Sequence, residues 1–279
     1  MNPLTHAYFA LELFKADNLT QDEKDHLIVG SFLPDIHITG LIQFHKTHNQ
    51  GLDFFHSLQN PLHKFLALGM ITHGENPQGL DYHTHNGQGF IKQKSSQILP
   101  LARKFQKHIG KINGSTVHYL IEFSVDNLVA EKDPSIVNQV LTAFRNPKIK
   151  TAITAFSNHL GFSEKKNNKI IKLLNNKHLL NYFYNFSSPE TASQNWLNLT
   201  FYRNIKRGKN LPFREKFKKL SKFTYYNFKR KINDEHITNL FYEINSNLRS
   251  HVPIFLAKNQ TKLNNLKNEL LRDIRTPKS

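Results

Sequence analysis

The chain has 279 residues, of which 38% are hydrophobic, so it is long enough to bury one large core or two smaller ones. It contains no cysteine, which excludes disulfides, thiolate catalysis and cysteine-based zinc fingers and leaves histidine and carboxylate as metal ligands. No apolar run approaches the roughly 20 residues of a membrane span, and the first residues do not resemble a signal peptide, so we expect a soluble, cytoplasmic protein.

The net charge of +17 is distributed unevenly along the chain. Residues 1–130 contain 10 lysines and arginines against 11 acidic residues, whereas residues 131–279 contain 28 against 10. Histidine follows the opposite trend, because 12 of the 16 histidines lie in residues 1–130. We therefore expect a histidine-rich, metal-binding helical core over residues 1–130. A basic helical region over residues 131–279 is expected to pack on that core as one globular unit.

Helix signals recur along the chain, and the alternation typical of strands is hard to find, so we predict an all-α protein. Thr20 and Glu23 have the spacing of a capping box at the start of a helix. The segment Asn76–Gly89 is polar and rich in glycine, which predicts a loop between helices. Asn113–Ser115 breaks the chain before an apolar run with helical spacing, Val117–Val129.

The basic half shows similar signals. Asp133-Pro134 and Ser188-Pro189 each place a capping residue before a proline suited to the first helical turn. Further helices are predicted over residues 164–175, 212–231, 234–248 and 254–273. Trp196 is expected to be a core residue.

Residues 213–231 interleave aromatic side chains with cations at near-helical spacing. This pattern suits an interfacial helix on an anionic membrane or a contact with a nucleic-acid backbone. It equally suits a scaffold helix that buries its aromatic side chains and leaves its lysines in water.

Potential metal ligands begin in the first predicted amphipathic helix, where His6 follows Thr5. A lone histidine in such a helix is usually structural. Asp35 comes directly after Pro34 at the end of an apolar helix, where a carboxylate either binds a metal or caps the next segment. Three histidines follow that also suit ordinary surface positions, namely His45, His48 and His56.

The next potential ligands surround the predicted loop. An apolar helical stretch, Phe65–His73, has a histidine at its end. Asp81, His83 and His85 follow in an Asp-x-His-x-His arrangement, which either converges on a metal or forms a solvated loop.

His118 and Glu122 are four residues apart, so on a helix their side chains point to one side and can bind a single cation. Asp126 extends the same face by one turn. Taken alone, His118 and Glu122 also suit a surface pair. Several motifs that combine histidine with carboxylate within 118 residues nevertheless favour metal binding, and these ligand types suit zinc.

The order of these motifs resembles that of the zinc-dependent phospholipase C family, which shares its fold with the P1-type nucleases. The resemblance covers roughly residues 4–126 and rests on Thr5-His6, Gly30-Ser31-Phe32-Leu33-Pro34-Asp35 and His118-x-x-x-Glu122. It implies a multi-helix phospholipase C/P1 nuclease-like bundle with the metal site between helices. The implied metal ligands are His6, Asp35, His56, His73, Asp81, His83, His118 and Glu122. His48 is an alternative to His56, and His85 is an alternative to His83.

Two positions depart from the family's pattern. The central His-x-x-x-Asp is interrupted because residue 77 is a proline, so Asp81 replaces that aspartate only if the turn at Asn76–Gly79 brings it back. The family also uses an N-terminal tryptophan as a metal ligand, whereas this chain begins Met1-Asn2. We therefore expect two zinc ions rather than the full three.

The resemblance also implies an activity, that of a zinc-dependent phosphoric ester hydrolase in which the metals activate a water molecule. Asp35 is the expected catalytic residue, which bridges two metals or orients the attacking water. The expected substrate is a phosphodiester or phosphomonoester, with a phospholipid head group as the first choice. The alternatives are a P1-type nuclease or nucleotidase and a non-catalytic, metal-bound relative that binds acidic surfaces. An HD-type phosphohydrolase is excluded, because the sequence has no adjacent His-Asp pair.

Overall fold

The computed structural model describes residues 3–109, 112–176, 187–194, 196 and 235–276. Within these ranges all regular structure is helical, which confirms the all-α prediction. None of the helices in the described part of the chain is long and apolar enough to cross a membrane. The helix predicted over residues 212–231, with its basic and aromatic segment 213–231, lies outside the described residues.

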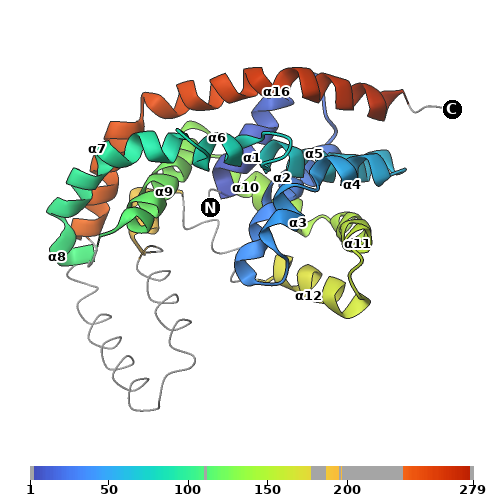
Figure 1. Cartoon of the computed structure of the whole chain (residues 1–279), viewed down its shortest axis with the longest axis horizontal. Coiled ribbons are helices and arrows are strands. Elements are labelled where there is room, and N and C mark those ends of the chain that lie inside the picture. The colour runs from blue at the N-terminus through green and yellow to red at the C-terminus, as the bar shows by residue number, and fades with distance from the viewer. Residues whose placement is uncertain (1–2, 110–111, 177–186, 195, 197–234, 277–279) are drawn as a thin grey trace, which may run out of the picture.

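Two helices, α2 (Gln21–Phe32) and α5 (Pro61–His73), pack closely along each other at the centre of the molecule (Figure 1). Gly30 makes this approach possible, because a Cβ atom at that position would lie only 2.0 Å from the carbonyl oxygen of Leu66. The carboxyl ends of both helices lie together, and the Ser31 carbonyl oxygen is 2.6 Å from Nδ1 of His73. The close packing thus fixes the position of a predicted metal ligand.

α1 (Pro3–Leu13) packs against α2 and α5 and also contacts α9 (Gly114–Lys132). Nine of its eleven residues are buried, so the expectation of an amphipathic helix is wrong. Its sequence is apolar or small almost throughout, which suits an interior helix.

Two predicted helix starts are confirmed. Thr20 N donates to the Glu23 carboxylate at 2.7 Å, which completes the capping box of α2. Asn113 Oδ1 accepts a hydrogen bond from Thr116 N at 2.9 Å at the start of α9.

The segment Asn76–Gly89, predicted to be a loop, contains the short helix α6 (Leu80–His85). Leu80 is buried, and Thr84 Oγ1 donates to the Leu80 carbonyl at 2.8 Å. Six residues are too few for a stable isolated helix, so packing on neighbouring helices maintains α6. The sequence shows no apolar periodicity there, which is why the prediction was wrong.

The remaining helices of the first 130 residues connect these elements. They are η1 (Lys15–Asp17), η2 (Leu33–Thr39), α3 (Phe44–His48), α4 (Gly51–Ser57), α7 (Phe90–Lys104) and α8 (Gln106–Ile109).

The described part of the basic half is also helical. It contains α10 (Ile136–Arg145), α11 (Ile149–His159), α12 (Glu164–Leu174), helical residues 189–194, a helix over residues 235–248, and α16 (His251–Arg275). Ser188 Oγ accepts a hydrogen bond from Thr191 N at 3.3 Å, as expected of a cap. α10 begins two residues after Pro134, because the Asp133 carboxylate accepts from Ser135 N at 3.0 Å instead of capping a helix there. Trp196 is buried, as predicted.

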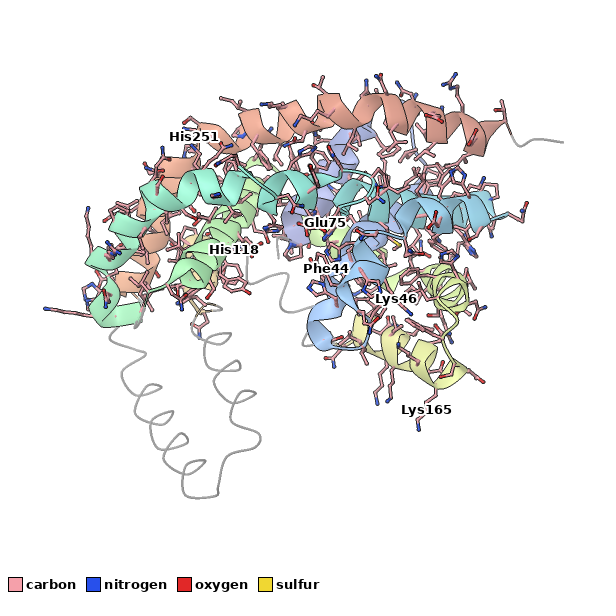
Figure 2. The ribbon with its side chains drawn as sticks, viewed as in Figure 1. Phe44, Lys46, Glu75, His118, Lys165 and His251 are labelled. Carbon is pink, nitrogen blue, oxygen red and sulfur yellow. The ribbon has the colours of Figure 1, made fainter. Side chains whose placement is uncertain are left out.

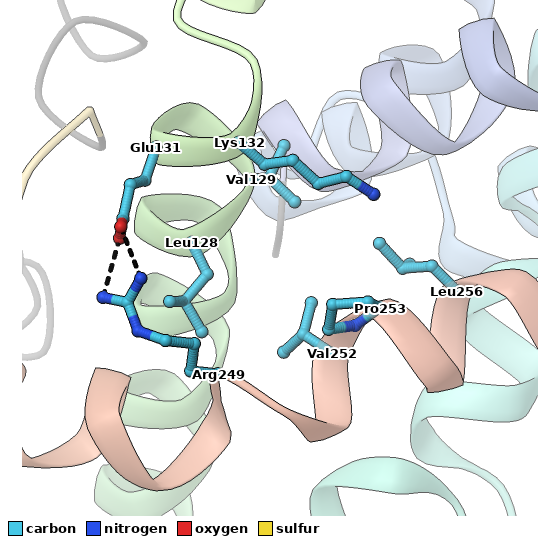
Figure 3. Close-up of a pocket in the computed structure, with 8 residues that line it drawn as sticks. All are labelled: Leu128, Val129, Glu131, Lys132, Arg249, Val252, Pro253 and Leu256. Carbon is cyan, nitrogen blue, oxygen red and sulfur yellow. Dashed lines mark hydrogen bonds and ion pairs between the residues drawn. The ribbon is translucent and has the colours of Figure 1, made fainter.

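α16 extends along one side of the molecule (Figure 1). Its buried Lys267 pairs with Asp17 at 2.9 Å. Just before α16, Arg249 forms a two-contact ion pair with Glu131 of α9, beside a small pocket lined by Leu128 and Pro253 (Figure 3). Helices from both sides of residue 130 therefore pack on one another, while the division into two regions stays a prediction.

Candidate metal centre

The carboxylate of Asp81, on α6, lies among four histidines from four helices. Its Oδ1 is 3.2 Å from Nε2 of His6 and 3.2 Å from Nε2 of His85. Its Oδ2 is 3.3 Å from Nε2 of His48 and 3.3 Å from Nε2 of His73. All four imidazoles thus present the same ring nitrogen to one carboxylate.

A second group adjoins the first through His85. Nε2 of His85 is 3.7 Å from Glu122 Oε1, and Nε2 of His118 is 3.1 Å from the same oxygen. The rings of His85 and His118 are stacked, with centroids 4.9 Å apart. His118 and Glu122 lie one turn apart on α9, and this spacing is what placed them together in the sequence-based prediction.

Each of the two groups brings together three side chains that could hold a metal ion. The donor atoms of His6, His73 and Asp81 lie within 4.8 Å of one another, and so do those of His85, His118 and Glu122. Two ligands bound at about 2.0–2.1 Å to a tetrahedral ion are roughly 3.3 Å apart, close to the separations around Asp81.

Burial differs between the two groups. His6, His48, His73 and Asp81 are all buried, whereas the side chains of His85 and His118 are 26% and 33% exposed. The site is therefore closed at the α5 end and open to solvent where α6 faces α9.

In His48 and His73, the hydrogen bond at Nδ1 determines whether Nε2, which faces Asp81, carries a proton or a lone pair. Nδ1 of His73 lies 2.6 Å from the Ser31 carbonyl, and Nδ1 of His48 lies 3.2 Å from the Phe44 carbonyl. A carbonyl only accepts, so we assign the proton of each neutral ring to Nδ1. Each Nε2 then directs a lone pair toward the Asp81 carboxylate.

With lone pairs on Nε2 of His48 and His73, these nitrogens and the Asp81 carboxylate are acceptors that face one another, and a positive charge between them would stabilise the arrangement. Nε2 of His48 and Nε2 of His73 have no hydrogen-bond partner among the described residues, although both lie 3.3 Å from Asp81. Buried acceptors that face each other without a donor are costly. A cation, or a proton on some of the rings, resolves the conflict, and histidine whose outer nitrogen binds a carbonyl is a common metal ligand.

Burial and the neighbouring charges together shift the pKa values of His73 and His6 in opposite directions. Burial acts to lower the pKa of His73, but the charges of Asp81 and Asp35 outweigh it and hold this pKa above its ordinary value. Burial and the neighbouring His73, whose ring stacks on His6 at 3.6 Å, lower the pKa of His6 to about 4. At neutral pH His6 is therefore an uncharged imidazole, the form that binds metal.

The carboxylates of the two groups are ionised. Burial acts to raise the pKa of Asp81, but the charge of His73 and the contacts with the surrounding imidazoles hold it well below its ordinary value. Burial likewise opposes ionisation of Glu122, yet nearby positive charge, including that of His118, lowers its pKa to about 2. Ionised carboxylates and imidazole nitrogens are both ligand types that a divalent cation can use.

Asp35 lies beside the first group, on η2. It is 5% exposed, its Oδ2 has no hydrogen-bond partner among the described residues, and its charge acts to raise the pKa values of His6 and His73. It belongs to neither of the two sets of donor atoms within 4.8 Å. Asp81, not Asp35, contacts both groups. The expected role of Asp35, to bridge two metals or to orient the attacking water, stays a prediction.

Two more of the predicted ligands lie outside both donor groups. His56 lies exposed on α4 with its ring against Phe55, and the alternative, His48, contacts Asp81. His83 points toward α16, where its Nδ1 is 3.4 Å from Lys262 Nζ, and the alternative, His85, contacts Asp81.

The other predicted ligands in the two groups are brought together as predicted, namely His6, His73, Asp81, His118 and Glu122. Asp81 and His85 are four residues apart, and this spacing would have identified His85 had a helix been expected there.

Two further residues form the rim of the buried group. Phe44, labelled in Figure 2, is 41% exposed and stacks on the His48 ring with centroids 3.8 Å apart. His37 lies edge-on to the same ring at 5.0 Å and directs its Nδ1 to the Pro34 carbonyl at 2.9 Å. Neither residue belongs to a motif that the sequence alone would single out.

Comparisons of the chain with family models, with curated proteins and with solved structures find no match. The chemistry of the site therefore has to follow from its own residues.

Proposed function

We propose that this chain is a zinc-dependent phosphoesterase, similar to phospholipase C, with a site for at least two metal ions. The observation that carries the proposal is the position of Asp81, which lies between the imidazoles of His6 and His73 on one side and that of His85 on the other. A carboxylate shared by two ligand groups is the arrangement expected of adjacent metal ions.

The donor types favour zinc. The two groups supply imidazole nitrogens and carboxylate oxygens, with imidazoles in the majority. Magnesium and calcium prefer sites made of oxygen, whereas nitrogen-rich sites suit zinc and its neighbours among the divalent transition metals.

Each group would hold one ion. His6, His48, His73 and Asp81 would bind the first, and Asp35 lies beside this group. His85, His118 and Glu122 would bind the second. Bound divalent cations at such a site lower the pKa of a water molecule and neutralise charge on a phosphate oxygen. The solvent-exposed side at His85 and His118 leaves room for a substrate there.

A basic surface on α12 supports an anionic partner. Lys165, labelled in Figure 2, is exposed together with Lys169 and Lys172 at helical spacing. The adjacent Lys166 interacts electrostatically with Lys46 of α3. None of these five lysines forms an ion pair with a described carboxylate. An anionic membrane or a nucleic acid is thus a suitable surface for contact with the basic half.

The test has two steps. Protein purified without chelator should contain about two zinc ions per chain by mass spectrometry. The zinc-loaded protein is then assayed against phospholipid, phosphomonoester and single-stranded nucleic acid. Hydrolysis of phospholipid supports the proposal, and cleavage of nucleic acid alone favours the P1-type nuclease. Bound zinc without any hydrolysis favours the non-catalytic relative. A metal content well below one that added zinc does not restore contradicts the metal site itself.

A further inference from the structure

A buried carboxylate that belongs to neither ligand group joins two helices of the site. Asp126, on α9, is fully buried, and Thr5, on α1, is 1% exposed. Oδ1 of Asp126 accepts a hydrogen bond from Thr5 N at 2.9 Å and another from Thr5 Oγ1 at 2.5 Å. The two residues are 121 positions apart in the chain, so this contact is purely tertiary.

The contact caps the first turn of α1. Thr5 is the third residue of that helix, and its N–H is one of the donors that a helix cannot satisfy from within. Asp126 therefore does for α1 what a local capping side chain does for other helices.

Both helices hold ligands next to the contact. His6 follows Thr5 directly and belongs to the first group, with Nε2 3.2 Å from Asp81. Glu122 precedes Asp126 by one turn of α9 and belongs to the second group. The Asp126–Thr5 contact thus joins the backbone next to His6, a ligand of the first group, to α9, the helix that holds Glu122 of the second group.

We infer that Asp126 is a positioning residue, which fixes His6 of the first group relative to His118 and Glu122 of the second. This inference rests on the proposed metal site. Residues that orient metal ligands without touching the metal commonly change metal affinity by about 10- to 100-fold when they are replaced.

Two substitutions separate this role from the alternatives. Asp126→Asn keeps an oxygen that accepts from both Thr5 donors, whereas Asp126→Leu has a similar volume and no acceptor. If Asp126 were itself a metal ligand through its second oxygen, Asp126→Asn would reduce metal binding as much as Asp126→Leu. If the contact only stabilised the fold, neither substitution would weaken one metal more than the other.

The experiment is a titration of metal-free protein with Co²⁺, followed by its visible absorption. His6→Gln and Glu122→Gln serve as references, because each removes one ligand from one group. Asp126→Leu should weaken by about 10-fold or more the binding step that His6→Gln impairs, and it should leave the step that Glu122→Gln impairs within about twofold. Asp126→Asn should behave as the wild type.

Unchanged binding in Asp126→Leu, equal weakening of both steps, or equal loss in Asp126→Asn would overturn the inference. If Asp126→Leu does not fold, Thr5→Val removes only the hydroxyl contact and should weaken the same step by about threefold, and no change there is the overturning result. A wild type that binds no Co²⁺ overturns the metal site as well, whereas a wild type that binds two ions with the variants unchanged overturns only the role of Asp126.

Discussion

His83 and His85 lie two residues apart on α6 but face different parts of the molecule. Nε2 of His85 is 3.2 Å from Asp81, whereas Nδ1 of His83 is 3.4 Å from Lys262 of α16. His85→Gln should therefore lower zinc affinity by about 10-fold or more, because it removes a donor from the site. The measurement is zinc competition with a chromogenic chelator.

His83→Gln is the matched control for that prediction, since it makes the same chemical change on the same helix. It should bind zinc as the wild type does. Equal zinc affinities of His83→Gln and His85→Gln would contradict the assignment of His85, and not His83, as the donor on α6.

Asp81 of the first group and Asp35 beside it should respond differently to loss of charge. Asp81→Asn should reduce zinc content and turnover together, because Asp81 contacts both groups. Asp35→Asn should leave zinc content nearly unchanged and reduce turnover of a chromogenic phosphodiester by about 100-fold or more, as expected for a positioned acid–base group. Metal analysis and steady-state rates on the same preparations test this, and an Asp35→Asn protein as active as the wild type would exclude a catalytic role for Asp35.

At the level of helices, the close packing of α2 and α5 makes a specific stability prediction. A Cβ atom on Gly30 would lie 2.0 Å from a backbone oxygen, which no side-chain movement relieves. Gly30→Ala should therefore destabilise the fold by about 1–3 kcal/mol, with a fall in Tm of roughly 2–4 °C per kcal/mol.

Gly114→Ala is the control, because a Cβ atom there meets nothing within 4 Å. It should be neutral or stabilise by up to about 1 kcal/mol, since alanine restricts the unfolded chain. Thermal unfolding of both variants measures the difference, and equal Tm values would contradict the close packing of the two helices.

One helix that the sequence predicts well is α9, which has both an apolar run and a cap. α9 has a capping box at Asn113 and a long apolar run, so the sequence alone places His118 and Glu122 on one face. α6 has neither, and its ligands follow from packing on other helices. A segment that is predicted to be a loop gives no information on where its side chains point. The sequence therefore offers no physical reason to prefer His83 or His85 as the metal ligand. The same holds for His48 and His56, which lie on short helices set by tertiary contacts.

For the whole molecule, metal binding should be coupled to folding. Ligands from α1, α3, α5, α6 and α9 converge on the site, so an ion that binds only the folded chain stabilises all of these contacts at once. Free zinc at 100 times its Kd adds about 2.7 kcal/mol per site. Chelation should therefore lower Tm, and His118→Ala should reproduce much of the loss.

Differential scanning calorimetry with and without chelator tests this coupling. The control is the His56→Ala variant, which alters an exposed histidine away from the site and should keep the full response to chelator. A melting curve that does not change after verified metal removal would favour a surface role for His118 and Glu122.

The position of α16 has a consequence for the synthesis of this protein. Leu263 and Leu270 of α16 face Leu13 and Ile71 around a small apolar cavity, and Arg275 donates to the Asp17 carbonyl across 258 residues of sequence. A ribosome that adds about 5–20 residues per second needs roughly 13 to 50 s to make that length of chain. Once α5 has been made, α1 and α5 lack their final cover for most of this interval, so the emerging chain exposes an apolar surface to which a chaperone can bind.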